Sequence, residues 1–352
     1  SIPNANMYFF YKVGSRNEYI GITGISHFFE HMMFNGSKKF GPKMFDQTME
    51  FNGGANNAYT TQNVTVYTDW FPVSAMETIF DLESDRIASL SIDSKMIESE
   101  RGVVLSERST SLENSPWNML NDAVYATAFQ EHSYHWTVIG YETDIKNWTK
   151  EDLEKYFKTY YAPNNCVVVV SGNVKVAEVK RLAEKYMAPI PASNPPKPVN
   201  LVEPPQTGER RVYTQKEVPS PHLMIGYHTP EAKSKDFYPL SILSSVLSSG
   251  NSSRLHSELV DKKQLASMVG TDFSESFDPN LFMIYALAAK DVKESDIESA
   301  VYSEIEKIKK DGITDQELQK IKNQKLMEFY GQLETINGKS NNIGTYELFF
   351  GD

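Results

Sequence analysis

The chain has 352 residues, a length that suggests two domains, and its 46 acidic and 35 basic residues give a net charge of −11. This charge argues against a nucleic-acid-binding protein, which needs clustered Lys and Arg. No apolar run approaches the ~20 residues of a membrane span, and the single cysteine, Cys166, excludes a disulfide framework and a multi-cysteine zinc cluster.

The first half of the sequence alternates between strand and helix patterns. Aromatic and β-branched runs predict strands at residues 4–13, 59–70 and 166–171. Apolar periodicity predicts helices at residues 22–34, 43–51, 74–89, 94–112 and 150–160. Asn35-Gly36 and Asn52-Gly53-Gly54 are typical helix-stop signals after the first two helices.

A proline-rich segment at residues 189–206 divides the sequence. Residues 189–205 hold seven of the 17 prolines, and proline fixes φ and removes a backbone donor. We therefore expect an extended, fairly stiff linker between a first domain at residues 1–188 and a second at residues 207–352.

The second half repeats the order of the first. Its expected strands and helices lie at residues 222–228, 238–247, 253–261, 281–289 and 295–310. Asp93 lies near the start of one long charged helix, and Asp315 lies at the start of another. This internal similarity indicates two related α+β halves. The second half is shorter, so we expect its domain to be incomplete at the C-terminal end.

The segment His27-Phe28-Phe29-Glu30-His31 carries the clearest chemical signal. Histidines at i and i+4 of a helix project from one face, so both imidazoles can reach one zinc ion. Glu30 lies on the edge of the same face, within reach of a water molecule at the metal. The order is that of the inverzincin motif, and the plain alternative is a partly exposed helix without a metal.

A catalytic zinc needs a third protein ligand and an open position. Glu98, Glu100 and Glu107 compete for this place on spacing alone, since all lie in one predicted helix. Glu100 and Glu107 are seven apart and share a face, so one can ligate zinc while the other supports a ligand. The alternative is a solvated, salt-bridged helix face.

These motifs resemble the pitrilysin/insulinase family of zinc peptidases. The histidine motif precedes Glu107 by 75 intervening residues, and the similarity is greatest to the branch that includes the mitochondrial processing peptidase and its bacterial relatives. The resemblance extends over most of the chain, through the segments at residues 53–60, 160–174 and 247–255. It implies an α+β fold of two related domains, each a mostly antiparallel sheet packed with helices, with zinc only in the first.

The resemblance also implies roles for individual residues. His27, His31 and Glu107 would bind one zinc ion per chain, Glu30 would be the general base and Glu100 a supporting acid. Zinc would lower the pKa of a water molecule towards ~7 and polarise the scissile carbonyl, and Glu30 would pass the proton to the leaving amine. The peptide would add as a strand beside a segment at residues 57–67, with substrate-binding positions Asn57, Ala58, Tyr59 and Thr60.

One departure from the family pattern concerns the partner. The family's second domain carries an Arg and a Tyr that contact the substrate, whereas this chain has Val260 and Ser267 there. Neither side chain can supply that charge or phenolic donor. We therefore expect the chain to be the zinc subunit of a heterodimer whose homologous partner provides both residues. Two alternatives are less favoured than the heterodimer: a homodimer, and a chain in which Lys262 or Lys263 takes over the role of the missing residues.

Two other functions stay open at this point: a non-catalytic assembly subunit, and a zinc-binding protein without peptidase activity. The four residues His27, Glu30, His31 and Glu107 argue against the assembly subunit, which has no need of all four. The sequence starts at Ser1 rather than Met, so we expect trimmed termini. This leaves the compartment open, with a bacterial periplasm as the working expectation.

Overall fold

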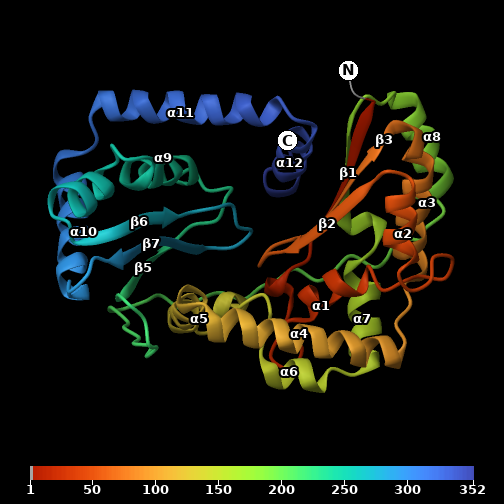
Figure 1. The fold of residues 1–352 in the computed structure, drawn as a ribbon, viewed down its shortest axis with the longest axis horizontal. Helices are drawn as coiled ribbons and strands as arrows, with labels where there is room; N and C mark the ends of the chain where they lie inside the picture. The colour runs from red at the N-terminus through yellow and green to blue at the C-terminus, as the bar shows by residue number, and fades with distance from the viewer. Residues whose placement is uncertain (1–2) are drawn as a thin grey trace. The chain divides into compact units, whose positions relative to one another are not determined.

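The computed structural model describes residues 3–352, so residues 1 and 2 of the expected first domain lie outside it. The chain forms two compact units of helices and antiparallel sheet (Figure 1), which confirms the expected α+β class. Unit 1 contains the described residues up to Thr110, with Glu131–Pro204 and Gln332–Asp352; unit 2 contains Ser111–Gln130 and Pro205–Gly331.

Unit 1 is built on a four-stranded antiparallel sheet with the order β2-β3-β1-β4. The strands are β1 (Asn4–Tyr11), β2 (Ala55–Thr60), β3 (Thr65–Pro72) and β4 (Cys166–Gly172). Side chains of a strand alternate between faces, so Met7, Phe9 and Tyr11 of β1 point into the main core, where they are almost fully buried. Because β2 is at the edge of the sheet, one side of its backbone lacks a neighbouring strand among the described residues.

Helices cover both faces of this sheet. Those of unit 1 are α1 (Ile25–Met32), α2 (Met44–Phe51), α3 (Met76–Ser89), most of α4 (Ser94–Asn114), α6 (Glu142–Asn147), α7 (Lys150–Tyr160), α8 (Val176–Tyr186) and α12 (Ile336–Phe349), with short turns η1 (Ser15–Asn17), η2 (Val73–Ala75), η3 (Ser133–His135) and η4 (Pro163–Asn165). Helix α12 packs against β1 and β4. Ser340 donates to Asn6 at 2.8 Å, and Gly344 lies so close to the Phe10 ring that a Cβ there would clash with it.

Unit 2 has a three-stranded antiparallel sheet with the order β5-β7-β6. Its elements are α5 (Pro116–Ala128), β5 (His222–Thr229), α9 (Phe237–Ser248), the π-helical η5 (His256–Lys262), β6 (Ala266–Asp272), β7 (Asn280–Ala288), α10 (Glu294–Asp311) and most of α11 (Asp315–Leu333). Helices α9 and α10 bury apolar side chains against one face of the sheet. Helix α5 contacts the other, where Trp117 packs on Tyr285 with ring centroids 5.7 Å apart.

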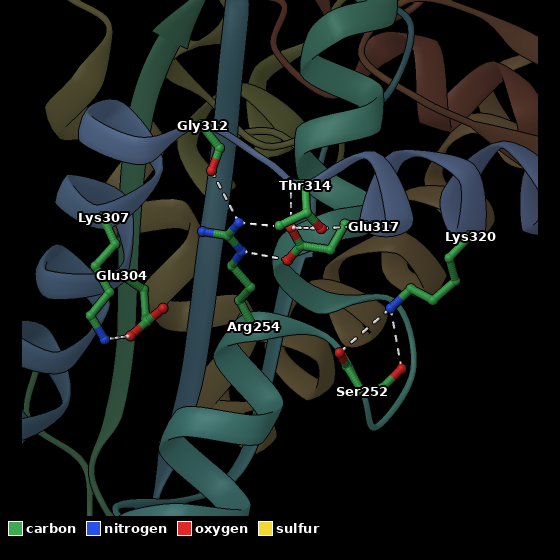
Figure 2. Close-up of polar contacts among 8 residues, drawn as sticks. All are labelled: Ser252, Arg254, Glu304, Lys307, Gly312, Thr314, Glu317 and Lys320. Atoms are coloured by element: carbon green, nitrogen blue, oxygen red, sulfur yellow. Dashed lines mark hydrogen bonds and ion pairs between the residues drawn. The ribbon is translucent and has the colours of Figure 1, made fainter.

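Arg254 ties the Ser/Gly loop after α9 to the start of α11. Its guanidinium forms two hydrogen bonds with the Glu317 carboxylate, at 2.6 and 2.8 Å, and donates to the carbonyl of Gly312 (Figure 2). Glu317 also accepts from the backbone NH of Thr314, whose hydroxyl accepts from the backbone NH of Glu317 in return. This reciprocal capping box fixes the first turn of α11.

The two units repeat one topology. In each, a strand is followed by helices, an antiparallel strand pair and two long helices, so that β1, β2 and β3 correspond to β5, β6 and β7. The helix that follows the second long helix, α5 in the first half and α12 in the second, belongs to the other unit. The domains expected on either side of the linker, residues 1–188 and 207–352, are contiguous in sequence, whereas each unit of the structure includes one helix from the other half of the chain. Residues 191–221, which contain most of the expected linker, form no helix or strand.

The single strand expected at residues 59–70 is wrong, because the structure has two strands there, β2 and β3. A turn at residues 61–64 separates them. The Thr61 hydroxyl accepts from the backbone NH groups of Asn63 and Val64 and so stabilises the reversal. Likewise, residues 57–67 are not one edge strand, since β3 pairs on both sides. No helix in residues 3–352 is long and apolar enough to cross a membrane.

Candidate metal centre

The helix that carries the histidine motif is held at its N-terminus by a buried carboxylate. Gly24 precedes α1 with a φ of 84°, a left-handed conformation that suits glycine. Glu18 accepts hydrogen bonds from the backbone NH groups of Gly24 and Ser26, at 2.8 and 2.9 Å, and from Trp136 Nε1. A carboxylate at a helix N-terminus accepts hydrogen bonds from NH groups that have no partner within the helix. Its negative charge also interacts favourably with the helix dipole. Burial nevertheless raises the pKa of Glu18 to about 8.

Three side chains from α1 and α4 converge on one point. Nε2 of His27 lies 3.6 Å from Oε1 of Glu107, and Nε2 of His31 lies 3.4 Å from Oε2 of Glu107. Among residues 3–352, these are the one group of at least three His, Cys, Asp or Glu whose candidate ligand atoms all lie within 4.8 Å of one another. Tetrahedral zinc with bonds of ~2.0–2.2 Å separates its ligand atoms by about 3.3 Å, so the donor set fits zinc.

Glu100 lies behind His31 and does not join this group. Its Oε1 is 2.8 Å from His31 Nδ1, and its Oε2 accepts from Asn35 Nδ2 at 2.7 Å. A proton on Nδ1 shared with a carboxylate leaves the Nε2 lone pair free for a metal. Nδ1 of His27 is buried and finds no hydrogen-bond partner within the described part of the chain.

Glu30 directly precedes His31 in α1, and its side chain faces strand β2. The Thr60 hydroxyl donates to its Oε2 at 2.6 Å. Burial raises the pKa of Glu30 above its usual value, and the hydrogen bond from Thr60 opposes that change. A general base with a raised pKa is a stronger proton acceptor near neutral pH.

The two histidines differ in charge in the metal-free protein. Burial, aided by the charge of His31, lowers the pKa of His27 to about 4, so His27 is neutral. Burial also disfavours the charged form of His31, but hydrogen bonds to Glu100 and Glu107 outweigh it and raise the pKa to about 9. The His31 hydrogen bonds in turn lower the pKa of both carboxyl groups. His31 must therefore lose a proton before it can bind a metal at neutral pH.

The expected substrate-binding residues lie on the edge strand β2, on alternate faces. Ala58 pairs with Tyr67 and Thr60 with Thr65, whose side chains are buried, and Tyr67 lies on the face that α1 covers, where its hydroxyl donates to the carbonyl of Phe29. The side chains of Asn57 and Tyr59 therefore point to the opposite face, where Tyr59 is 40% exposed. Thr60 contacts Glu30, a role that its Thr-rich strand sequence did not indicate.

A cavity of about 320 Å³ adjoins Glu30 and the edge strand. It is lined by Glu30, His31, Phe34, Asn35, Asp46, Asn56, Asn57, Ala58 and Glu100. Helices α1, α2 and α4 and strand β2 thus all contribute to it. A peptide laid along β2 could place a side chain in this space.

The structure separates the competing glutamates. Glu107 joins His27 and His31, Glu100 supports His31, and Glu98 is 70% exposed and pairs with Arg101. In unit 2, Val260 lies in η5 and packs against the core, and Ser267 is exposed on β6. Sequence reasoning missed Glu18 and Asn35, whose spacing from the motif follows no local pattern.

Comparisons with known proteins identify one peptidase family along most of the chain. A family model described as "Insulinase (Peptidase family M16)" matches residues 3–141, and one described as "Peptidase M16 inactive domain" matches residues 147–325. The chain is 36% identical to the zinc protease PqqE of Helicobacter pylori, over 92% of this chain and 74% of that protein.

Two further similarities concern a processing peptidase and a solved structure. The chain is 29% identical to the beta subunit of the mitochondrial-processing peptidase of Blastocladiella emersonii, over 77% of this chain and 59% of that protein. It superposes on the crystal structure of a protease from Helicobacter pylori with a TM-score of 0.93 and 33% identity, over 98% of this chain and 84% of the other.

Proposed function

Because this chain belongs to the insulinase family (peptidase family M16), we propose that it is a zinc-dependent endopeptidase that cleaves peptides or unfolded segments. The observation that carries the proposal is the convergence of His27, His31 and Glu107, with Glu30 beside them. A zinc ion held by these three residues would polarise a carbonyl and acidify a water molecule.

The residues of the chain itself would do the proton transfer. Glu30, ionised, takes a proton from the attacking water and later delivers it to the leaving amine. Thr60 holds the Glu30 carboxylate through its 2.6 Å hydrogen bond. Glu100 keeps the proton of His31 on Nδ1, so that Nε2 serves as the ligand atom.

The edge strand β2 would bind the substrate. Its unpaired backbone groups can accept a peptide as an additional antiparallel strand, which gives affinity with little demand on sequence. Asn57, Ala58, Tyr59 and Thr60 lie along this strand.

A homologous partner would complete the enzyme as a heterodimer. By the sequence resemblance, Val260 and Ser267 would occupy the positions at which the family pattern has an Arg and a Tyr that contact the substrate. The chain offers its own test: the double substitution V260R/S267Y should raise peptidase activity of the isolated chain. Full activity of the unmodified chain without any partner would contradict the heterodimer.

The peptidase claim is tested by zinc content and peptide hydrolysis measured together. Glu30→Gln keeps the three ligands, so zinc content should stay at one per chain while hydrolysis falls by about 10²–10⁴-fold. Glu50→Gln, on the exposed side of α2, is the matched control and should leave both unchanged. Bound zinc without Glu30-dependent cleavage, alone or with a partner, would refute the peptidase and favour a zinc-binding protein without peptidase activity or the non-catalytic assembly subunit. The assembly subunit draws support from the inactive-domain model matched by the second half.

The compartment is a separate proposal. We retain the bacterial periplasm, which cell fractionation with an antibody to the chain would test.

A further inference from the structure

Asp69 of β3 is a fully buried carboxyl group that the metal centre does not use. Its backbone is in register with Met7 of β1 and Asn56 of β2, and its side chain lies on the same face of the strand as that of Tyr67. The residue is 0% exposed, and neither carboxyl oxygen finds a hydrogen-bond donor among residues 3–352. A buried polar group without a donor requires a physical explanation.

The cation of this region, Arg86 on α3, is already matched by Glu83. Nε of Arg86 donates to one Glu83 oxygen at 2.8 Å, and Nη2 lies 2.5 Å from the other. Nη1 of Arg86 has no acceptor within the described part of the chain, so the guanidinium does not reach Asp69. One guanidinium therefore balances one carboxylate, and an ionised Asp69 would be a second buried negative charge without compensation.

The carboxyl groups of Asp69 and Glu83 lie within hydrogen-bonding distance of each other. Two ionised carboxylates have only acceptors, so a hydrogen bond between them requires one proton. Burial is the main cause that raises the pKa of Asp69 well above its usual value. The charge of Glu83 adds to this rise, and attraction to Arg86 opposes it only in part.

The other titratable groups around the cluster are neutral at pH 7. Burial raises the pKa of four side chains from β1, β3, β4 and the end of α7, namely Tyr11, Tyr67, Cys166 and Tyr161. Glu30 on α1 acts on Tyr67 and is engaged by Thr60. With one proton between Asp69 and Glu83, the cluster that includes Arg86 has no net charge.

We propose that Asp69 and Glu83 hold one shared proton, which the chain takes up from solvent when unit 1 folds. The site is separate from the metal centre, and the inference does not depend on peptidase activity. It bears on the cavity beside Glu30, because the Arg86 guanidinium lies 5.3 Å from the ring of Phe34, which lines that cavity.

The shared proton makes the folded state less stable as pH rises. In the unfolded chain Asp69 ionises above its ordinary pKa of about 3.9, whereas the folded pair keeps its proton. The stabilisation is therefore complete below that value and is lost as pH rises towards the higher folded pKa. Each pH unit in this range should increase the unfolding equilibrium constant about tenfold through this one proton.

Urea unfolding of the metal-free chain from about pH 5 to 8 tests the proposal. Asp69→Asn replaces the neutral acid by an amide of the same shape that can still donate to Glu83. The ratio of the wild-type unfolding constant to that of Asp69→Asn should rise about tenfold per pH unit. Glu83→Gln should also lose the proton uptake, because one carboxylate then remains for one guanidinium.

Glu77→Gln neutralises an exposed carboxylate on the same helix and should keep the wild-type pH dependence. A ratio for Asp69→Asn that does not change with pH would overturn the proposal, and proton uptake that persists in Glu83→Gln would overturn the sharing. Stability that depends on Na⁺, but not on choline at equal ionic strength, without proton uptake would assign the site to a metal cation instead.

A direct measurement on the wild type decides the question even if Asp69→Asn does not fold. In ¹³C NMR spectra, the carboxyl carbon of Asp69 should keep the chemical shift of a protonated acid across the same pH range. The chemical shift of an ionised carboxylate at neutral pH would overturn the proposal.

Discussion

The hydroxyl of Thr60 on β2 donates a 2.6 Å hydrogen bond to Glu30 on α1, across 30 residues of sequence. Burial raises the pKa of Glu30, and this hydrogen bond to the charged form partly offsets the rise. Thr60→Val therefore raises the pKa further. Because the base acts ionised, the acid limb of the kcat/KM profile should move to higher pH, by about one to two units.

The matched control for this shift is Thr68→Val, which removes a hydroxyl from β3 that donates to the carbonyl of Asn57. Its acid limb should coincide with that of the wild type. An acid limb that stays in place in Thr60→Val would mean that Thr60 does not tune the base.

Zinc binding should release a proton from His31 at neutral pH. The pKa of His31 is raised to about 9 and that of His27 lowered to about 4, so only His31 carries a proton to be displaced at pH 7. The apparent zinc affinity should rise about tenfold per pH unit between pH 7 and the pKa of His31. Calorimetry in buffers of different ionisation enthalpy counts the released protons.

Glu100→Gln should reduce both the number of protons released on zinc binding and the zinc affinity. Loss of the charged partner lowers the pKa of His31, so fewer protons are released at pH 7, and zinc affinity should fall by about 10–100-fold. Glu98→Gln, at an exposed position of the same helix, should behave as wild type. If Glu100→Gln and the wild type release the same number of protons, Glu100 does not support His31 as a zinc ligand.

Glu18 should stabilise the helix that carries the motif. Glu18→Ala leaves the NH groups of Gly24 and Ser26 and Nε1 of Trp136 without their acceptor. The expected cost is about 2–4 kcal/mol in the free energy of unfolding of unit 1, together with weaker zinc binding. Urea unfolding followed by Trp fluorescence measures the first effect, and an unchanged transition would show that the cap is dispensable.

A buried ion pair on α3 should also stabilise the fold of unit 1. Arg86 and Glu83 on α3 are each 1% exposed, their charged groups are 2.5–2.8 Å apart, and the guanidinium lies 4.4 Å from the Phe45 ring. Arg86→Met would leave Glu83 buried without its partner, at a cost of about 3–5 kcal/mol.

The exposed Arg181, which pairs with Glu178 on α8, provides the comparison for Arg86. Arg181→Met should leave the urea midpoint close to that of wild type, because solvent screens an exposed pair. Similar midpoints for the two variants would contradict a structural role for Arg86.

The sequence by itself determined what depends on local geometry. The family is confirmed, since the resemblance rests on short motifs, such as the one from His27 to His31, that are read directly from the sequence. The α+β class with antiparallel sheets is confirmed for the same reason. Local pattern was less reliable at the β2–β3 turn, where a strand-like composition continued through a reversal set by the Thr61 side chain.

The tertiary structure decided what depends on contacts between residues distant in the chain. Spacing alone left Glu98, Glu100 and Glu107 equivalent, whereas the packing of α4 against α1 places Glu107 with the histidines and Glu100 behind His31. The Thr60–Glu30 hydrogen bond, the Glu18 cap and the exchange of α5 and α12 between the units follow no helix or strand period. Each is fixed by packing and by the need of buried polar groups for partners, which local sequence periodicity does not encode.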